Sequence, residues 1–131
     1  MNTKLNKILA EISAGELIDK ITILEIKKIK ITDTKKLKEA DKELISLNNT
    51  MKNCIKDESA IVNLKEKLKE INLKLWDIED GKRNAERNND FGKKFIELAR
   101  NVYKFNDERA KIKSEINLIL NSNIREVKSH F

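Results

Sequence analysis

The chain is 131 residues long, with 39% hydrophobic and 38% charged residues, no proline, three glycines and a net charge of +6. This length favours a single domain over residues 1–131, and the scarcity of proline and glycine argues against a β-sandwich, a disordered tail or a collagen-like repeat. A high charged fraction with few turn residues is typical of long helices that bury only one apolar stripe.

Several kinds of site are excluded by residue usage. No apolar run exceeds three residues, so we expect neither a membrane span nor a signal-peptide core. Cys54 and His130 are the only cysteine and histidine, so neither an internal disulfide nor a Cys/His zinc cluster can form. The sequence also lacks a glycine-rich phosphate loop and a nucleophile elbow. We therefore expect a cytoplasmic protein without metal or cofactor.

Positive charge is concentrated between Lys27 and Lys38, where six lysines face only Asp33. Phosphate neutralisation supplies much of the affinity of nucleic-acid binders, but these proteins usually add arginine or aromatic stacking groups. This stretch has neither. We interpret it as a solvated helix end and expect no specific nucleic-acid binding.

The first predicted helix has clear start chemistry. Ser13 can cap it, and Glu16 can reach back to the Ser13 amide in a capping box. Apolar residues then lie on more than one side, which predicts that neighbouring helices cover this helix on more than one face. It should end near Lys30, before the Thr32–Thr34 turn.

Three further helices follow from apolar residues spaced three and four apart, the pattern of helices packed at shallow angles as in coiled coils. Turns are expected at residues 56–59 and 88–90, so the last two helices should each run about 30 residues, or about 45 Å. The apolar positions are Leu37, Ala40, Leu44, Leu47, Met51 and Cys54; then Ile61, Leu64, Leu68, Ile71, Leu75, Ile78 and Ala85; then Phe91, Phe95, Leu98, Val102, Phe105, Ile112, Ile116 and Ile119, with Arg109 interrupting the last set.

These elements predict an all-α, antiparallel helical bundle of about four helices, with two long helices in the C-terminal half. Cys54 should be a small buried residue of the second helix. Residues 7–12 and 124–128 could each form a short strand instead of irregular chain, and their pairing would tie the two ends together.

Polar residues beside the apolar stripes form the one candidate ligand site. Folding the long helices back at the second turn brings the third and fourth helices together, with Asn72 close to Asn106. If the first helix crosses the hairpin near that turn, it adds the carboxylate of Glu25 to this group. The candidate residues are Glu25, Trp76, Glu79, Asp80, Arg100, Tyr103 and Asn106. They form either a pocket or a set of ion pairs that fix helix register, because structural networks and functional sites both cluster charged groups.

Three separated blocks of the sequence resemble a family of short, uncharacterised bacterial proteins. They are residues 15–27 (GELIDKITILEIK), 75–80 (LWDIED) and 95–103 (FIELARNVY), and the likeness continues through residues 106–110 and 126–129. The family is a domain of unknown function, so the resemblance implies no reaction. It implies that many polar residues belong to the family pattern: Glu16, Asp19, Lys20, Glu25, Trp76, Glu79, Asp80, Arg100, Tyr103, Asn106, Asp107 and Arg109.

We expect an interaction or scaffolding protein that forms a homo-oligomer, because Ile23, Ile26, Ile45 and Leu73 lie outside the apolar stripes and need cover. A further protein partner is compatible with this role. The alternative is a small-ligand protein or enzyme, accessory to sugar-nucleotide or cell-surface glycan metabolism. Residue chemistry does not decide whether the chain is an enzyme, and it names no catalytic residue.

Overall fold

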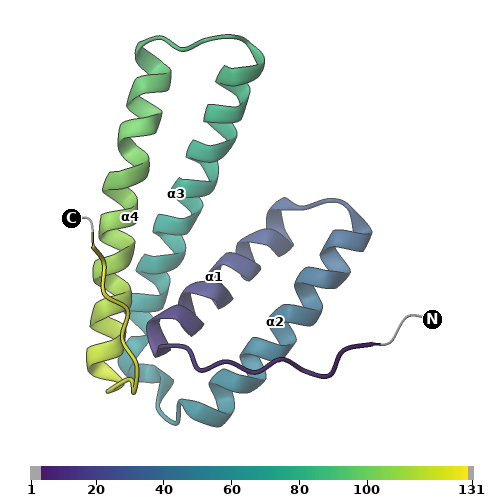
Figure 1. Ribbon diagram of the computed structural model, residues 1–131, viewed down its shortest axis with the longest axis vertical. Coiled ribbons are helices and arrows are strands. Elements are labelled where there is room, and N and C mark those ends of the chain that lie inside the picture. The colour runs from purple at the N-terminus through teal and green to yellow at the C-terminus, as the bar shows by residue number, and fades with distance from the viewer. Residues whose placement is uncertain (1–3, 130–131) are drawn as a thin grey trace.

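The structure, a computed structural model, describes residues 4–129 and contains four α-helices arranged as two antiparallel hairpins (Figure 1). Among these residues there is no strand. The predicted all-α bundle is therefore confirmed. The helices are α1 (Ala14–Lys30), α2 (Thr34–Cys54), α3 (Val62–Arg87) and α4 (Lys93–Ile119), with a short 3-10 helix, η1 (Glu58–Ile61), before α3.

Short polar side chains cap the starts of α1, α2 and η1, whereas α3 and α4 begin without a side-chain cap. Ser13 Oγ accepts a hydrogen bond from the Glu16 amide at 3.1 Å, and Asp33 Oδ1 accepts from the Lys35 amide at 3.1 Å. Asp57 begins η1 in the same way, within the predicted turn. The turn between α3 and α4 passes through Asn89 in the left-handed region at φ 52°, a conformation that asparagine tolerates better than most residues. One part of the predicted capping box is wrong, because the side chain of Glu16 does not return to the Ser13 amide.

Helix α1 lies at the centre of the packing and contacts α2, α3 and α4. Its apolar residues Ile18, Ile21 and Ile26 are almost completely buried, which confirms that it is covered on more than one face. The core around it is completed by Leu44 and Met51 of α2, Leu68 and Ile71 of α3, and Ile112 and Ile116 of α4.

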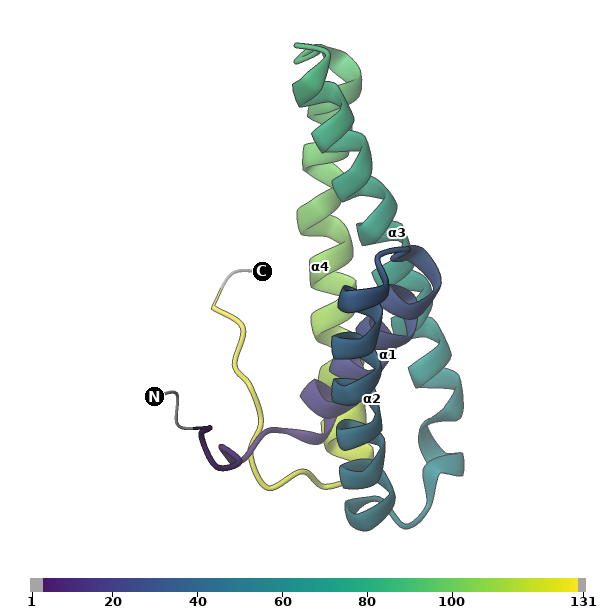
Figure 2. The same cartoon turned by 90° about the vertical axis from the view of Figure 1, so that its right-hand side faces the viewer.

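The α1–α2 hairpin covers only one half of the α3–α4 hairpin. Figures 1 and 2 show α1 against the part of the long hairpin that lies away from its turn, with α2 on the outer side of α1, while the turn end extends beyond both. Lys30, the last residue of α1, reaches Asp77 of α3 at 3.8 Å, so the cover ends near that level. We call the remaining part, residues 78–103, the distal hairpin.

Three expectations about individual residues are wrong. Cys54 is exposed, because it is the last residue of α2, where the helix leaves the core. Ile26 is buried within the chain itself and needs no second subunit to cover it. Residues 7–12 and 124–128 do not pair as strands. The chain on either side of the helices is instead linked by Asn123 Nδ2, which donates to Glu11 at 2.5 Å, and by the Ala14 amide, which donates to Ser122 Oγ at 2.9 Å.

No helix among the described residues combines the length and the apolar composition that a membrane crossing requires.

Candidate functional site

A carboxylate at the centre of the helix packing, that of Asp19 on α1, is fully buried at 0% exposure. It accepts hydrogen bonds from Arg109 of α4, with Nε 3.0 Å from Oδ1 and Nη2 against Oδ2. Asn72 of α3 donates from Nδ2 to Oδ1 at 2.8 Å. A two-point contact between arginine and a carboxylate is among the strongest hydrogen-bonded pairs in proteins, so three helices are joined at one buried charge.

The buried polar side-chain atoms around this carboxylate all find partners. Thr22 Oγ1 donates to the carbonyl oxygen of Asp19 at 2.8 Å and accepts from Asn72 Nδ2 at 2.9 Å. Within residues 4–129 no buried side-chain nitrogen or oxygen lacks a hydrogen-bond partner. The hydrogen bond with Asp19 raises the pKa of Arg109 above its ordinary value, against the opposing effect of burial. The cluster is therefore a satisfied ionic network, which orders the helices that contribute to it.

A second ion pair lies one turn away along α1. Lys113 Nζ of α4 is 2.6 Å from Glu16 Oε2, 3.9 Å from Asp19 Oδ2 and 3.3 Å from Glu126 Oε2 in the C-terminal segment. Burial by itself would raise the pKa of Glu16, but its interactions with Glu126 and Lys113 outweigh burial and lower that pKa to about 2. Burial would lower the pKa of Lys113, and the hydrogen bond with Glu16 overcomes this effect and raises it.

Close contact between α1 and α4 sets the register of these pairs. The Gly15 amide donates to Asn117 Oδ1 at 2.6 Å, and a β-carbon at Gly15 would overlap the carbonyl oxygen of Lys113. Because the helices run past each other in opposite directions, moving four residues forward from Gly15 along α1 corresponds to moving four residues back from Lys113 along α4. Asp19 thereby meets Arg109.

A cleft of about 470 Å³ opens beside this network, between α4 and the C-terminal segment. Asn106, Arg109, Lys113 and Asn117 lie along one face of α4, and Lys128 faces them from the segment. Lys128 is held by an ion pair of 3.2 Å with Asp107. The cleft is thus lined mainly by basic and amide side chains. Among the described residues, no group of three or more histidine, cysteine, aspartate or glutamate side chains could hold a metal ion.

The seven residues predicted as a site do not converge. Glu25 pairs with Lys65 at 3.8 Å and Lys69 at 3.6 Å, and it lines a different pocket from the one that Asn106 lines. Glu79 is exposed and pairs within its own helix, with Arg83 at 3.2 Å.

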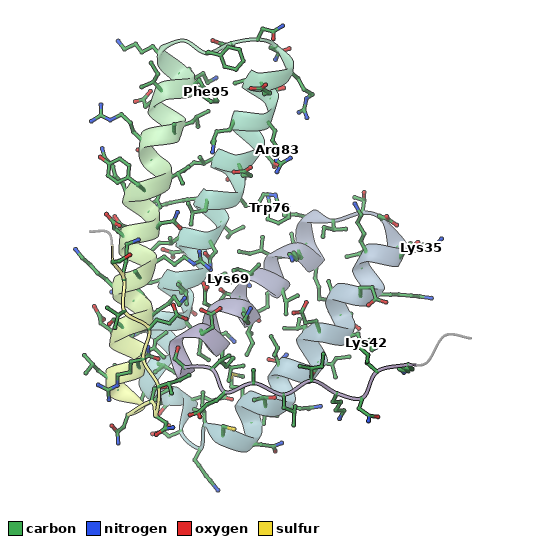
Figure 3. The ribbon with its side chains drawn as sticks, viewed as in Figure 1. Lys35, Lys42, Lys69, Trp76, Arg83 and Phe95 are labelled. Carbon is green, nitrogen blue, oxygen red and sulfur yellow. The ribbon has the colours of Figure 1, made fainter. Side chains whose placement is uncertain are left out.

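The remaining predicted residues also lie apart from the buried network. Asp80, Arg100 and Tyr103 are exposed and Trp76 is half-buried, while Figure 3 shows Trp76 at the level where α1 ends. The predicted convergence is wrong because α1 crosses the hairpin far from its turn, not near it. Whether any of the seven binds a ligand stays a prediction.

The expected contact between Asn72 and Asn106 is also wrong, since Asn72 turns to Asp19 and Thr22 on α1. The residues of the real network carried a signal of their own. Arg109 occupies an apolar position of the α4 repeat, and Asp19 lies between Ile18 and Ile21 on a helix covered on several faces. Charges at such positions on two different helices indicate a buried pair.

The fold and its site define an all-α protein whose first helix is fixed by buried ion pairs across a long helical hairpin. The model of a family of unknown function (DUF6165) matches residues 8–131, and the chain belongs to this family. The resemblance to a domain of unknown function is therefore confirmed. Neither the curated proteins nor the solved structures include a match to this chain.

Proposed function

We propose that the protein is a helical interaction module that forms a homodimer through its distal hairpin. The observation that carries the proposal is the set of exposed apolar side chains on the uncovered half of the long hairpin. Phe91 is 50% exposed, Ile96 55% and Tyr103 55%, although each is large and apolar or aromatic. Exposed apolar patches of this kind mark surfaces that bind other proteins.

The lengths of the helices support this location. Helix α3 has 26 residues and α4 has 27, so each spans about 40 Å, whereas the 17 residues of α1 span about 26 Å. Helix α1 therefore cannot cover the whole hairpin. Figure 3 shows Phe95 and Arg83 in the part that extends beyond α1 and α2. Phe91 and Phe95 contact edge to face, with ring centroids 5.5 Å apart, which makes an aromatic group at the tip.

A second copy of the same surface is the partner that the charges favour. The distal hairpin carries both signs, with Glu79 and Asp80 next to Lys82 on α3, and with Lys94 and Arg100 on α4. When two copies meet around a twofold axis, the acidic residues of one α3 can face the basic residues of the other α4. If all charges of this surface had one sign, two copies of it would repel each other. This complementarity supports self-association over docking of a strongly charged foreign partner.

Sedimentation velocity at micromolar concentration tests the proposal with matched variants. Ile96→Asp places a charge in the proposed interface and should shift the protein from dimer to monomer, while its thermal unfolding stays close to wild type. Leu118→Asp is the control, because Leu118 is 64% exposed on the same helix but at the opposite end, and this variant should stay dimeric. A wild-type monomer throughout the micromolar range, or a dimer that survives Ile96→Asp, would contradict the proposal.

A further inference from the structure

The cleft between α4 and the C-terminal segment differs in charge from the network behind it. Three basic side chains line it, those of Arg109, Lys113 and Lys128, against one acidic side chain, that of Glu126. The carboxylates that hold two of these cations, Asp19 and Glu16, belong to α1 and do not line the cleft. Arg109 and Lys113 are therefore held by carboxylates that lie behind them, on the side away from the cleft.

Three side chains of α4 that line the cleft, Arg109, Asn117 and Asn106, keep hydrogen-bond donors without a partner among residues 4–129. Arg109 uses Nε and Nη2 on Asp19, so its Nη1 donors have no acceptor among residues 4–129. Asn117 accepts through Oδ1 from the Gly15 amide, which leaves its Nδ2 donors without a partner in the same described range. The amide of Asn106, one turn before Arg109, likewise makes no hydrogen bond there. These donors from one helix face converge on a single cavity.

Glu126 is held loosely in the cleft. It shares Lys113 with Glu16, and its distance of 3.3 Å to Lys113 Nζ is longer than the 2.6 Å of Glu16. Its side chain is 57% exposed. The segment that carries it, residues 120–129, has no helix or strand and folds back along α4 (Figure 1). An exposed ion pair of this kind contributes little free energy and can be exchanged for another anion.

We propose that this cleft is a binding site for a small oxyanion, a carboxylate or a phosphate group, and that the carboxylate of Glu126 occupies it when no ligand is bound. Guanidinium, ammonium and amide donors on one surface match the planar or tetrahedral oxygens of such groups. The volume of about 470 Å³ lies in the range of small-molecule sites. The C-terminal segment then acts as a strap, whose acidic residue competes with the ligand. This site is separate from the distal hairpin and does not depend on the proposed dimer.

NMR titration of the full chain with inorganic phosphate, and separately with succinate, tests the site at constant ionic strength. We expect saturable shifts of the backbone amides of residues 106–117 and 126–128. Saturation by phosphate alone identifies a phosphate-bearing ligand, and saturation by succinate alone identifies a carboxylate. Absence of a saturable shift with either anion would overturn the proposal.

Variants separate the strap from a general effect of charge. Glu126→Gln removes the internal competitor and should lower the Kd about two- to fivefold, as expected for loss of an exposed ion pair. Glu115→Gln is the matched control, because Glu115 is exposed on α4 and lies outside this cleft. It should leave the Kd unchanged, and an equal gain in both variants would overturn the role of the strap. Lys113→Gln, with its fold checked by circular dichroism, should weaken binding, and unchanged binding would overturn the site.

Discussion

Asp19 and Arg109 lie 90 residues apart in the chain, and their side chains make a two-point ion pair that joins the first helix to the last. Asp19 has no exposed surface and Arg109 retains 29% exposure, so the carboxylate carries most of the cost of burial. Removing one partner of such a pair leaves an uncompensated charge, which costs more free energy than the intact pair contributes.

Arg109→Ala should lower the free energy of unfolding by about 3–5 kcal/mol, because the fully buried Asp19 would lose its main counter-charge. Urea denaturation at neutral pH measures this change. Glu108→Ala, at the exposed neighbouring position of α4, is the control and should change stability by less than about 0.5 kcal/mol. Equal, small effects of both substitutions would show that the pair is not needed to hold α1 on the hairpin.

Gly15→Ala should lower stability by about 1–3 kcal/mol, because the added methyl group would overlap the main-chain carbonyl oxygen of Lys113 and force α1 away from α4. Gly81→Ala offers a contrast within α3. Its β-carbon would come 3.2 Å from a methyl group of Leu98, which is a side-chain atom that can move, and alanine favours the helix by up to about 1 kcal/mol over glycine. Thermal unfolding of both variants would contradict this account if Gly15→Ala were the milder one.

Stability should fall as the pH drops from about 4.5 to about 2. The pKa of Glu16 is lowered from 4.5 to about 2 in the folded chain, so its ionised form stabilises the fold above the unfolded value. This contribution, at most about 3 kcal/mol, is lost as the carboxylate takes up a proton in that window. Glu16→Gln should flatten the loss, whereas Glu108→Gln should not. Identical acid profiles for wild type and Glu16→Gln would exclude this linkage.

Cys54 should react with a thiol reagent in the folded protein at a rate within a few-fold of that in urea, because its side chain is exposed at the end of α2. Absorbance of the released thiolate follows the reaction. Strong protection in the native state would restore the sequence-based expectation of a buried residue. Cys54→Ser should change the free energy of unfolding by less than about 0.5 kcal/mol.

Nucleic acid should bind weakly and be released near physiological salt. A groove between α1 and α2 does collect Lys27, Lys35, Lys36 and Lys42, two of which are labelled in Figure 3, but Glu39 and Glu43 line it as well. Interleaved acids reduce the number of phosphates that the lysines can neutralise, so both affinity and its salt dependence stay small. Fluorescence anisotropy with a labelled oligonucleotide measures this, and a defined oligonucleotide retained at about 0.2 M salt would refute it.

The helices and most of their limits could be predicted from local chemistry, although Phe91, expected in the last helix, lies before α4. Helix formation along apolar residues at helical spacing depends only on neighbours along the chain, and so does capping by Ser13, Asp33 and Asp57. The structure has helices at these places. The turn near Asn89 is of the same kind. The site was predicted less well, since only Asn106 of the seven candidate residues lines the cleft beside the buried network.

The position of α1 along the long hairpin was decided by tertiary contacts alone. Periodicity specifies which face of a helix is buried but not how far one helix is shifted along another, because several shifts bury similar apolar surface. Here the close approach at Gly15 and the pairing of Asp19 with Arg109 select one shift. The sequence by itself determined four helices and their apolar faces. The register also required the buried carboxylate of Asp19 to meet its partners on α3 and α4, because a buried charge without a partner costs several kcal/mol.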